Sequence, residues 1–307
     1  MYLVPCPLQQ LPMLMVWYKQ PDKSSMILDP MSMKSFTIKD DACIKGGKIC
    51  ASKYGWLLMC EEVKHKVDQK LVLTGLNFFF FNPFTSEVIH LPFLKKSGFT
   101  CATFTSPPTS KNCLVFNLYT MDRDPDRVII STCYQGDRRW ISSHYYAYNF
   151  NAIRNVVFKD GDFYCYSRSG RLGIYSPTQR TWTKPGMQNY IKCIQTRKHM
   201  VEYGGELLLV IKSKKSKKTI FHRLDYLQRR WIRVRSIQVQ DVLCGNPSSI
   251  TISNAKTKRD VYDRVNYNCL TSKNKYSSLA SLYRAVIHLH CPNPAPYGKK
   301  VWVEWQH

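Results

Sequence analysis

The chain has 307 residues, of which 44% are hydrophobic and 13% are aromatic. These fractions exclude an intrinsically disordered protein and provide enough apolar side chains for a large core. Lys and Arg outnumber Asp and Glu by 45 to 21, which gives a formal net charge of +24 and favours acidic partners: an acidic protein surface, a nucleic acid or an anionic lipid.

The cysteines and the uncharged N-terminal stretch are both read as ordinary parts of a protein of the cytoplasm or nucleus. Twelve cysteines are scattered without a Cys-x-x-Cys pair, so we expect free thiols rather than a zinc ribbon or a redox pair. Residues 1–18 carry no charge, but Pro5, Pro7 and Pro12 interrupt them. This pattern predicts neither a signal peptide nor a membrane span, so we expect no membrane partner.

The first elements in chain order are predicted strands. Residues 11–17 form the first apolar element, and residues 26–39 read as a hairpin that turns at Asp29-Pro30. Residues 54–59 read as a strand in which Gly55 packs closely against a neighbour. The charged residues 61–71 are expected to form a long loop or a short helical insertion. We divide the chain into an N-terminal segment, residues 1–25, and one large domain, residues 26–307.

A run of four phenylalanines, Phe78 to Phe81, is the strongest strand signal in the chain. Four consecutive aromatic residues cannot alternate between core and solvent, so both faces of this strand are expected to be buried. Asn82-Pro83 then supplies a turn, and a further strand follows at residues 88–92. Later strands follow the same rhythm, with Asp160-Gly161 as a strong tight-turn dipeptide. The last predicted strand, residues 301–305, suits the closure of a ring.

The same design of strands around a polar turn recurs along the chain. The recurring turns begin at five positions separated by 39 to 55 residues: Asp29, Asn82, Asp137, Ser176 and Asp225. A tryptophan follows three of them, and Gly204-Gly205 precedes the last tryptophan in a kelch-like arrangement. This spacing predicts an all-β fold, a β-propeller of about six blades, with seven possible, built from kelch-like repeats.

Two of the tryptophans follow a pair of arginines, in Arg138-Arg139-Trp140 and Arg229-Arg230-Trp231. Such a group can stack on and pair with nucleic acid. Because these groups occupy equivalent positions of the repeat, we favour a structural role, in which each Trp seals one blade against the next under the arginine stems.

The sequence resembles the plant F-box-associated β-propeller family, also described as F-box/kelch-repeat or KIB-type propellers. The resemblance rests on residues 52–58 (Ser-Lys-Tyr-Gly-Trp-Leu-Leu), residues 81–85 (Phe-Asn-Pro-Phe-Thr), residues 156–164 and the closing residues 301–304. Family members carry an F-box ahead of the propeller, which docks on the Skp adaptor of a cullin ubiquitin ligase, while the propeller selects the substrate. No F-box is evident in the N-terminal segment, residues 1–25, and residues 26–307 are expected to form the β-propeller domain. Only ten residues precede Leu11, so the resemblance implies a Skp adaptor only for a longer form that includes an F-box.

No residue set predicts catalysis, a metal site or a cofactor site. The chain lacks Gly-x-Ser-x-Gly and His-Glu-x-x-His motifs. His288 and His290 would share one face of a strand while Cys291 would point away, and two ligands do not complete a tetrahedral site, so we read all three as ordinary strand residues. We therefore expect no enzyme and no cofactor.

The candidate partner-binding residues are the lysines of one predicted hairpin tip. This run can act as a nuclear import signal or contact an acidic partner, although we favour a solvated hairpin tip. Its members are Lys212, Lys214, Lys215, Lys217 and Lys218. Two functions stay open: recognition of a protein substrate for ubiquitination, implied by the resemblance, and binding of nucleic acid by a basic propeller, implied by the charge.

Overall fold

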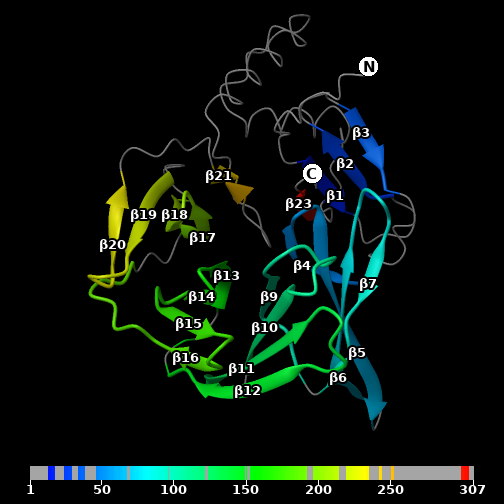
Figure 1. Ribbon diagram of the computed structural model, residues 1–307, viewed down its shortest axis with the longest axis horizontal. Coiled ribbons are helices and arrows are strands. Elements are labelled where there is room, and N and C mark those ends of the chain that lie inside the picture. Colours follow the sequence, from blue (N-terminus) through cyan, green and yellow to red (C-terminus); the bar gives the residue numbers. More distant parts are fainter. Residues whose placement is uncertain are drawn as a thin grey trace, which may run out of the picture.

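The computed structural model describes residues 13–17, 24–29, 34–38, 46–67, 70–95, 97–121, 124–148, 150, 153–191, 196–213, 219–234, 242–243, 250–251 and 299–303. Within these ranges every regular element is a β-strand, and all neighbouring strands in a sheet run antiparallel. Figure 1 shows the sheets following one another around a ring. The predicted all-β propeller is therefore confirmed.

Sheets 1 and 2 come first in the chain. Sheet 1 has the strand order β23-β1-β2-β3, and sheet 2 has the order β4-β5-β6-β7, with β8 also pairing with β6. The strands of these two sheets are β1 (Met13–Trp17), β2 (Met26–Asp29), β3 (Lys34–Thr37), β23 (Lys299–Val303), β4 (Lys48–Lys53), β5 (Trp56–Val67), β6 (Lys70–Phe81), β7 (Val88–His90) and β8 (Leu94–Lys95).

Sheets 3, 4 and 5 repeat the four-stranded design, and a two-stranded sheet follows them. Their orders from the ring centre outward are β9-β10-β11-β12, β13-β14-β15-β16 and β17-β18-β19-β20, and β21 pairs with β22. The strands are β9 (Cys101–Phe104), β10 (Leu114–Met121), β11 (Asp124–Tyr134), β12 (Ile141–Tyr146), β13 (Ile153–Lys159), β14 (Asp162–Ser167), β15 (Leu172–Ser176), β16 (Thr181–Thr183), β17 (Thr196–Tyr203), β18 (Glu206–Ser213), β19 (Thr219–Asp225), β20 (Arg230–Val234), β21 (Val242–Leu243) and β22 (Ile250–Thr251).

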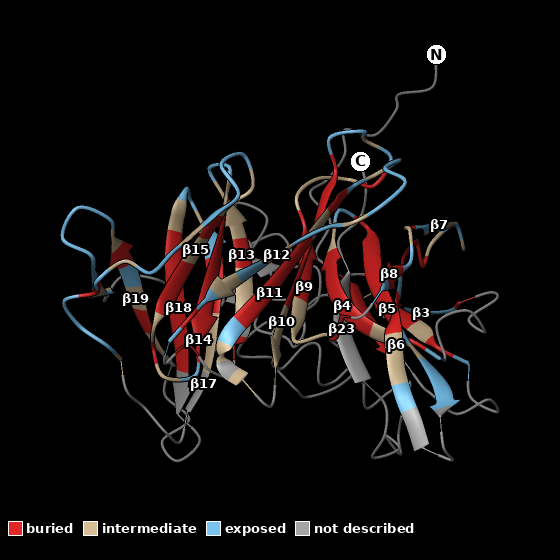
Figure 2. Ribbon diagram, turned by 90° about the horizontal axis from the view of Figure 1, so that it is seen from below, coloured by how far each residue is buried: buried red, intermediate tan, exposed pale blue. Residues whose placement is uncertain are grey.

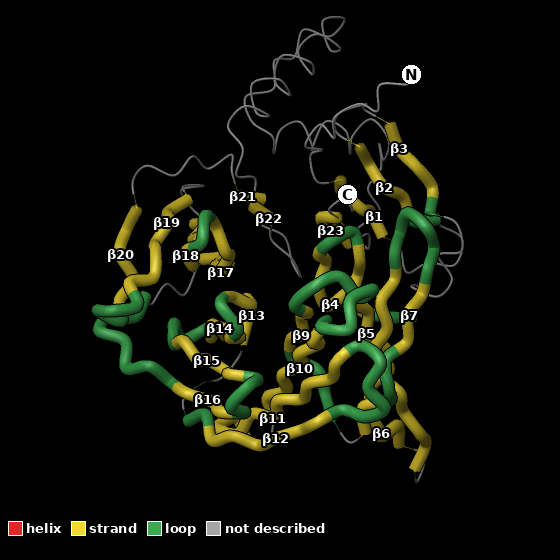
Figure 3. Tube along the Cα trace, in the orientation of Figure 1, coloured by secondary structure: helices red, strands yellow, loops and turns green. Residues whose placement is uncertain are grey.

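The innermost strands of the sheets contact one another around the ring. β23 contacts β4, β4 contacts β9, β9 contacts β13 and β13 contacts β17, while β22 lies against β17. Figure 3 shows these strands near the centre and the outer strands joined by loops at the periphery. The described residues thus form five larger sheets and one two-stranded sheet, and the count of about six blades stays a prediction.

Sheet 1 is closed by strands from distant parts of the sequence. β23 pairs antiparallel with β1, with Met13 opposite Val303 and Trp17 opposite Lys299. The predicted closing strand at the C-terminal side is thereby confirmed for residues 299–303. Since β1 lies ahead of position 26, the sheet reaches into the predicted N-terminal segment, and the division at residue 26 stays a prediction.

All five predicted turns lie at the same place in their sheets, between the third strand and the outermost strand. Asn and Asp stabilise these turns with their own side chains, as their chemistry predicts. Asn82 Oδ1 accepts the N–H of Phe84 at 2.9 Å, and Asp225 Oδ1 accepts the N–H of Gln228 at 3.0 Å. Local side-chain chemistry therefore fixes where each outermost strand begins.

Tight turns with positive φ join the first and second strands in sheets 2, 4 and 5. Tyr54-Gly55 has φ values of 53° and 76°, and Asp160-Gly161 has values of 50° and 87°. Gly204-Gly205 makes the equivalent turn in sheet 5. The prediction that Gly55 lies within a strand is wrong, because this glycine supplies the left-handed conformation that the turn requires.

Residues 61–71 were predicted to form a loop or a helical insertion, and this prediction is wrong. They continue β5 and β6 as a long hairpin, in which Glu61 pairs with Asn77 and Lys66 pairs with Leu71. Cross-strand pairing over this length overrides the local charge density. The hairpin extends beyond the rest of sheet 2, as Figure 2 shows, and we call it the β5–β6 arm.

The hydrophobic core lies between successive sheets rather than in one central mass. Phe78 and Phe80 pack in the cluster that sheet 2 shares with sheet 3, whereas Phe79 and Phe81 pack in the cluster shared with sheet 1. All four side chains are buried, so the prediction of a strand buried on both faces is confirmed. Each such ring contributes roughly 1.5–3 kcal/mol by burial, which ties sheet 2 to both neighbours.

The three tryptophans near the outermost strands seal each sheet against the preceding one, as predicted. Trp140 of sheet 3 contacts Phe78 of sheet 2, with ring centroids 5.2 Å apart. Trp231 of sheet 5 meets Tyr166 of sheet 4 edge to face, with centroids 5.9 Å apart. Trp182 packs in the cluster between sheets 3 and 4. The arginines before Trp140 and Trp231 are exposed.

Candidate partner-binding surfaces

The antiparallel sheets give the ring two chemically different ends. Because strand direction alternates, the turns between the first and second strands and between the third and fourth strands lie at one end, which we call the turn end. The hairpins between the second and third strands, and the starts of the inner strands, lie at the other end, which we call the loop end. Figure 2 shows the turn end above and the loop end below.

Two ion pairs lie at the turn end. Arg223 donates to Glu206 across β18 and β19 with an N–O distance of 2.7 Å. Lys159 contacts the carboxylate of its neighbour Asp160. The turn end also carries exposed arginines that make no ion pair within the described ranges, Arg138 and Arg139 among them. Its short turns, rather than a lack of positive charge, leave it few ways to adapt to a partner.

Positive charge at the loop end exceeds its local carboxylate partners. Lys48, at the start of β4, and Lys64, in the β5–β6 arm, both contact the single carboxylate of Glu62. The hydrogen bonds from these two ammonium groups lower the pKa of Glu62 below its usual range. Lys66, further along the arm, is exposed and has no ion pair within the described ranges. This sheet therefore presents a net positive group of side chains to solvent.

Further cations occupy the loop end of sheets 3 and 4. Arg127 at the start of β11 contacts Asp124 at 3.5 Å. Arg168, in the turn between β14 and β15, is exposed, and the guanidinium of Arg171 lies over the Tyr190 ring at 5.5 Å from its centroid. The loop end thus distributes cations over three neighbouring sheets, an arrangement suited to an extended acidic surface.

The predicted lysine run belongs to the loop end of sheet 5. Lys212 lies near the end of β18, where its backbone pairs with Arg197 of β17 and Thr219 of β19. The other candidates, Lys214, Lys215, Lys217 and Lys218, lie outside the described residues, so their role as partner-binding residues stays a prediction. The position of Lys212 places the start of this run at the same end of the ring as the arm.

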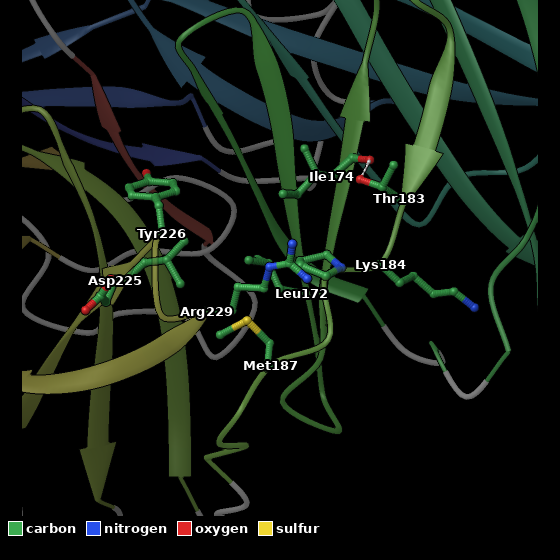
Figure 4. A pocket seen from close by; sticks show the side chains of 10 residues that line it. Leu172, Ile174, Thr183, Lys184, Met187, Asp225, Tyr226 and Arg229 are labelled. Carbon is green, nitrogen blue, oxygen red and sulfur yellow. Dashed lines mark hydrogen bonds between the residues drawn. The ribbon is translucent and has the colours of Figure 1, made fainter.

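A cavity of about 390 Å³ lies at the junction between sheets 4 and 5 (Figure 4). Its walls come from β15 and β16, from the connection that follows β16, and from β19 and the turn after it. The lining residues are Leu172, Ile174, Thr183, Lys184, Pro185, Met187, Leu224, Asp225, Tyr226 and Arg229. Apolar side chains form the inner part of this cavity, and we call it the junction pocket.

Hydrogen bonds hold the connection after β16 against the edge of β20. The N–H of Gln188 donates to the carbonyl of Arg229 at 2.9 Å. The Asn189 amide binds both backbone groups of Trp231: its Oδ1 accepts from the N–H at 2.7 Å, and its Nδ2 donates to the carbonyl at 2.9 Å. The wall of the junction pocket is therefore fixed before any partner arrives.

Two pKa shifts bear on the chemistry of these surfaces. Burial, with a smaller contribution from the carboxylate of Asp137, raises the pKa of Cys133 to about 12. Burial, together with nearby carboxylates, raises the pKa of Tyr226 in the junction pocket to about 12. The thiol and the phenol are therefore protonated at neutral pH, and Tyr226 can donate a hydrogen bond to a partner.

Within the described ranges, no three His, Cys, Asp or Glu side chains gather as metal ligands. His288, His290 and Cys291 lie outside those ranges. The same part of the chain contains no helix with the length and apolar character needed to cross a bilayer.

Comparison with known proteins decides the family. A sequence profile described as the KIB1-4 beta-propeller matches residues 25–270. The chain belongs to the KIB1-4 β-propeller family. The predicted resemblance to plant F-box-associated propellers is thereby confirmed, and the family match agrees with the ring of four-stranded sheets.

Curated relatives of this KIB1-4 propeller come from Arabidopsis thaliana. The F-box/kelch-repeat protein At1g57790 is 32% identical over 66% of this chain and 55% of that protein. The F-box protein At1g49360 is 30% identical over 67% of this chain and 41% of that protein, and the F-box protein At4g00893 is 27% identical over 61% and 45%. The chain therefore spans about half the length of the curated relatives it matches.

Sequence reasoning missed both the β5–β6 arm and the junction pocket. The arm could have been found from the alternation of Val63, His65 and Val67 with Lys64 and Lys66, in a stretch without Gly or Pro. The pocket combines residues some 50 positions apart in two sheets, and no local pattern marks such a combination. The sequence signal for the pocket is a Gln-Arg pair two residues before a tryptophan, which occurs at Arg180 and again at Arg229.

Proposed function

We propose that this chain is a non-catalytic protein-binding propeller that selects the substrate of an F-box protein in a cullin ubiquitin ligase. The observation that carries the proposal is the pair of exposed loop-end cations that make no ion pair within the described ranges, Lys66 in sheet 2 and Arg168 in sheet 4. We propose that this end binds an acidic region of the substrate protein.

Three features support a binding role for this surface. The pairing of β1 with β23 joins distant parts of the chain in sheet 1, so the loop end rests on a scaffold of paired strands. Loops on such a scaffold vary without disturbing the core, which makes them suited to recognition. Electrostatic complementarity also raises the association rate and rejects partners of the wrong charge.

The ubiquitin ligase part of the proposal rests on the family and its relatives. Relatives named as F-box proteins match this chain over about half of their length. We propose that the Skp adaptor joins only through an F-box in a longer form of the protein, and that the complex works in the cytoplasm or nucleus. No cofactor takes part in this function.

Affinity capture from an Arabidopsis thaliana extract tests the proposal. The immobilised chain should retain a defined protein after nuclease treatment, and that protein, once purified, should bind the chain directly. Co-expression with a form that carries an F-box should then lower the abundance of this protein, and a proteasome inhibitor should restore it. A partner whose abundance does not respond in this way would refute the ligase role.

Nucleic acid is the second candidate partner, and the β5–β6 arm is the observation that favours it. A two-stranded ribbon fits the major groove of DNA, and the arm carries Lys64, Lys66 and Lys70. Binding to phosphates would weaken steeply with salt, with a slope of about −0.9 in log K against log salt for each phosphate contacted. A salt titration with duplex DNA and with the captured protein therefore distinguishes the two candidates.

A further inference from the structure

The junction pocket has the features of a site for a short segment of a partner protein. We propose that it receives one large apolar side chain of an extended substrate segment, while Arg229 and Lys184 bind the carboxylate of an adjacent Asp or Glu. This inference rests on the proposed function, because it assigns a sequence preference to the protein substrate. It adds a second contact at the outer junction of sheets 4 and 5.

The size and lining of the pocket suit a side chain. Its volume of about 390 Å³ lies near the lower end of the range of about 300–1,000 Å³ that ligand pockets occupy. Leu172 and Met187 are buried at its base, and Ile174 is half-buried beside them. Thr183 and Arg229 at the rim are exposed, so the cavity opens to solvent. A half-open apolar cavity accommodates the side chain of a segment that continues along the surface.

Comparison with the neighbouring junction explains why this cavity exists. Between sheets 3 and 4, the outermost strand β12 carries Tyr145, whose hydroxyl donates to the carbonyl of Arg180 at 2.7 Å. Tyr145 lies five residues after Trp140, and the residue five positions after Trp182 is Met187. β16 has only three residues against the six of β12. At the junction of sheets 4 and 5, the outermost strand β16 is therefore shorter, and Met187 takes the place that Tyr145 has at the junction of sheets 3 and 4.

The charges at the rim favour an anionic neighbour for the inserted side chain. Among the described residues that line the pocket, Asp225 is the only carboxylate, and its Oδ1 already accepts the N–H of Gln228. Asp160, Glu202 and Glu206 lie near Tyr226 outside this lining. Arg229 and Lys184 make no ion pair within the described part of the chain. A planar guanidinium binds a carboxylate through two parallel hydrogen bonds. The pocket therefore combines an apolar base with a cationic rim, which complements a hydrophobic residue beside an acidic one.

The walls are positioned in advance, which reduces the entropy cost of binding. Arg229 has a φ of 47° in its turn, and its carbonyl is held by the N–H of Gln188. Tyr226 packs edge to face on Tyr164 of sheet 4, and Lys159 lies 5.6 Å from the centroid of its ring. Figure 4 shows Tyr226 and Arg229 on one side of the cavity, facing Ile174 and Thr183 on the other.

Fluorescence anisotropy with defined peptides tests the inference on the full chain. The probe is a labelled peptide in which one leucine is flanked by two aspartates. One control peptide replaces the leucine with serine, and the other replaces both aspartates with lysine. The chain should bind the probe and should bind each control peptide at least fivefold more weakly, on the order of what one apolar contact or one ion pair provides.

A matched pair of variants locates the binding site. Arg229→Asn removes the cation, and asparagine tolerates the positive φ of this position. Arg180→Asn makes the same change at the equivalent turn of sheet 4, where φ is 52° and no pocket residue is altered. Arg229→Asn should lower the affinity for the probe peptide about fivefold, whereas Arg180→Asn should leave this affinity unchanged.

Three results would overturn the inference: no binding of the probe, equal affinity for the serine control, or equal effects of the two variants. Thr183→Phe, which fills the cavity from its exposed rim, provides an independent check and should abolish the leucine preference. Retention of that preference would also overturn the inference. If the pocket fails while the captured protein still binds the loop end, the proposed function stands without it.

Discussion

Replacing Trp231 by alanine is the sharpest test of how the sheets hold together. Trp231 lies on β20 with 3% of its surface exposed and packs edge to face against Tyr166 of sheet 4. It belongs to the cluster that joins sheets 4 and 5, together with Leu172, Leu209 and Leu224. Removing the indole therefore leaves a cavity between two sheets rather than within one.

The expected cost is about 3–5 kcal/mol, the usual range for truncation of a buried Phe or Trp to Ala. The lost edge-to-face contact accounts for about 0.5–1.5 kcal/mol of that sum. Urea unfolding followed by far-UV circular dichroism measures the change without relying on the removed fluorophore. Trp231→Phe should recover much of the loss because it keeps an aromatic ring in the cluster.

Leu227 supplies the control for this measurement. It lies in the turn before Trp231 and is 97% exposed, so Leu227→Ala should change stability by no more than about 0.5 kcal/mol. A cost below about 1 kcal/mol for Trp231→Ala would refute the assignment of this tryptophan to the seal between sheets.

Three further predictions address a turn, a close approach and a buried thiol. Gly161→Ala should cost about 1–2 kcal/mol from the backbone alone, because Gly161 has a φ of 87° with no atom within 4 Å of an added Cβ; an unchanged urea midpoint would contradict this. Gly173→Ala should cost about 1–3 kcal/mol by overpacking, because the added Cβ would lie 2.3 Å from the Trp182 ring; a thermal melt at the wild-type temperature would contradict this. Cys133, with a pKa raised to about 12, should resist alkylation by iodoacetamide at pH 8 until urea unfolds the chain, and mass spectrometry measures this alkylation. The raised pKa of this thiol contributes fully to folding stability below a pH of about 8.5, the pKa of a thiol in the unfolded chain, and this contribution is lost as the pH rises toward 12.

The features that sequence predicted correctly depend on local chemistry or on extreme composition. Asn82 and Asp225 mark turns because each side chain caps its own backbone, which needs no distant partner. The run from Phe78 to Phe81 predicts burial on both faces because no pattern of alternation can expose it. The positions of Trp140, Trp182 and Trp231 follow from the repeat itself, because each lies at the same place in its sheet and therefore packs against the preceding sheet in the same way.

The features that sequence missed depend on pairing between distant residues. The β5–β6 arm is charged enough to read as a loop, and only its cross-strand register makes it a ribbon. Tyr54-Gly55 was predicted as part of a strand, but its two positive φ values show a turn. The junction pocket arises because β16 is shorter than β12, a difference that has meaning only once the two junctions are compared in space.

We propose that recognition takes place at the loop end, and reversing the charge at each end of the ring tests this most directly. Lys66→Glu with Arg168→Glu alters two exposed loop-end cations, and Arg138→Glu with Arg139→Glu makes the same net change at the turn end. The affinity of the captured partner protein is measured for both variants by calorimetry at one salt concentration. We predict that the loop-end variant loses about tenfold or more in affinity, at about 1.4 kcal/mol for each factor of ten, while the turn-end variant binds as the wild type does. Equal losses in the two variants, or a loss confined to the turn end, would contradict the account.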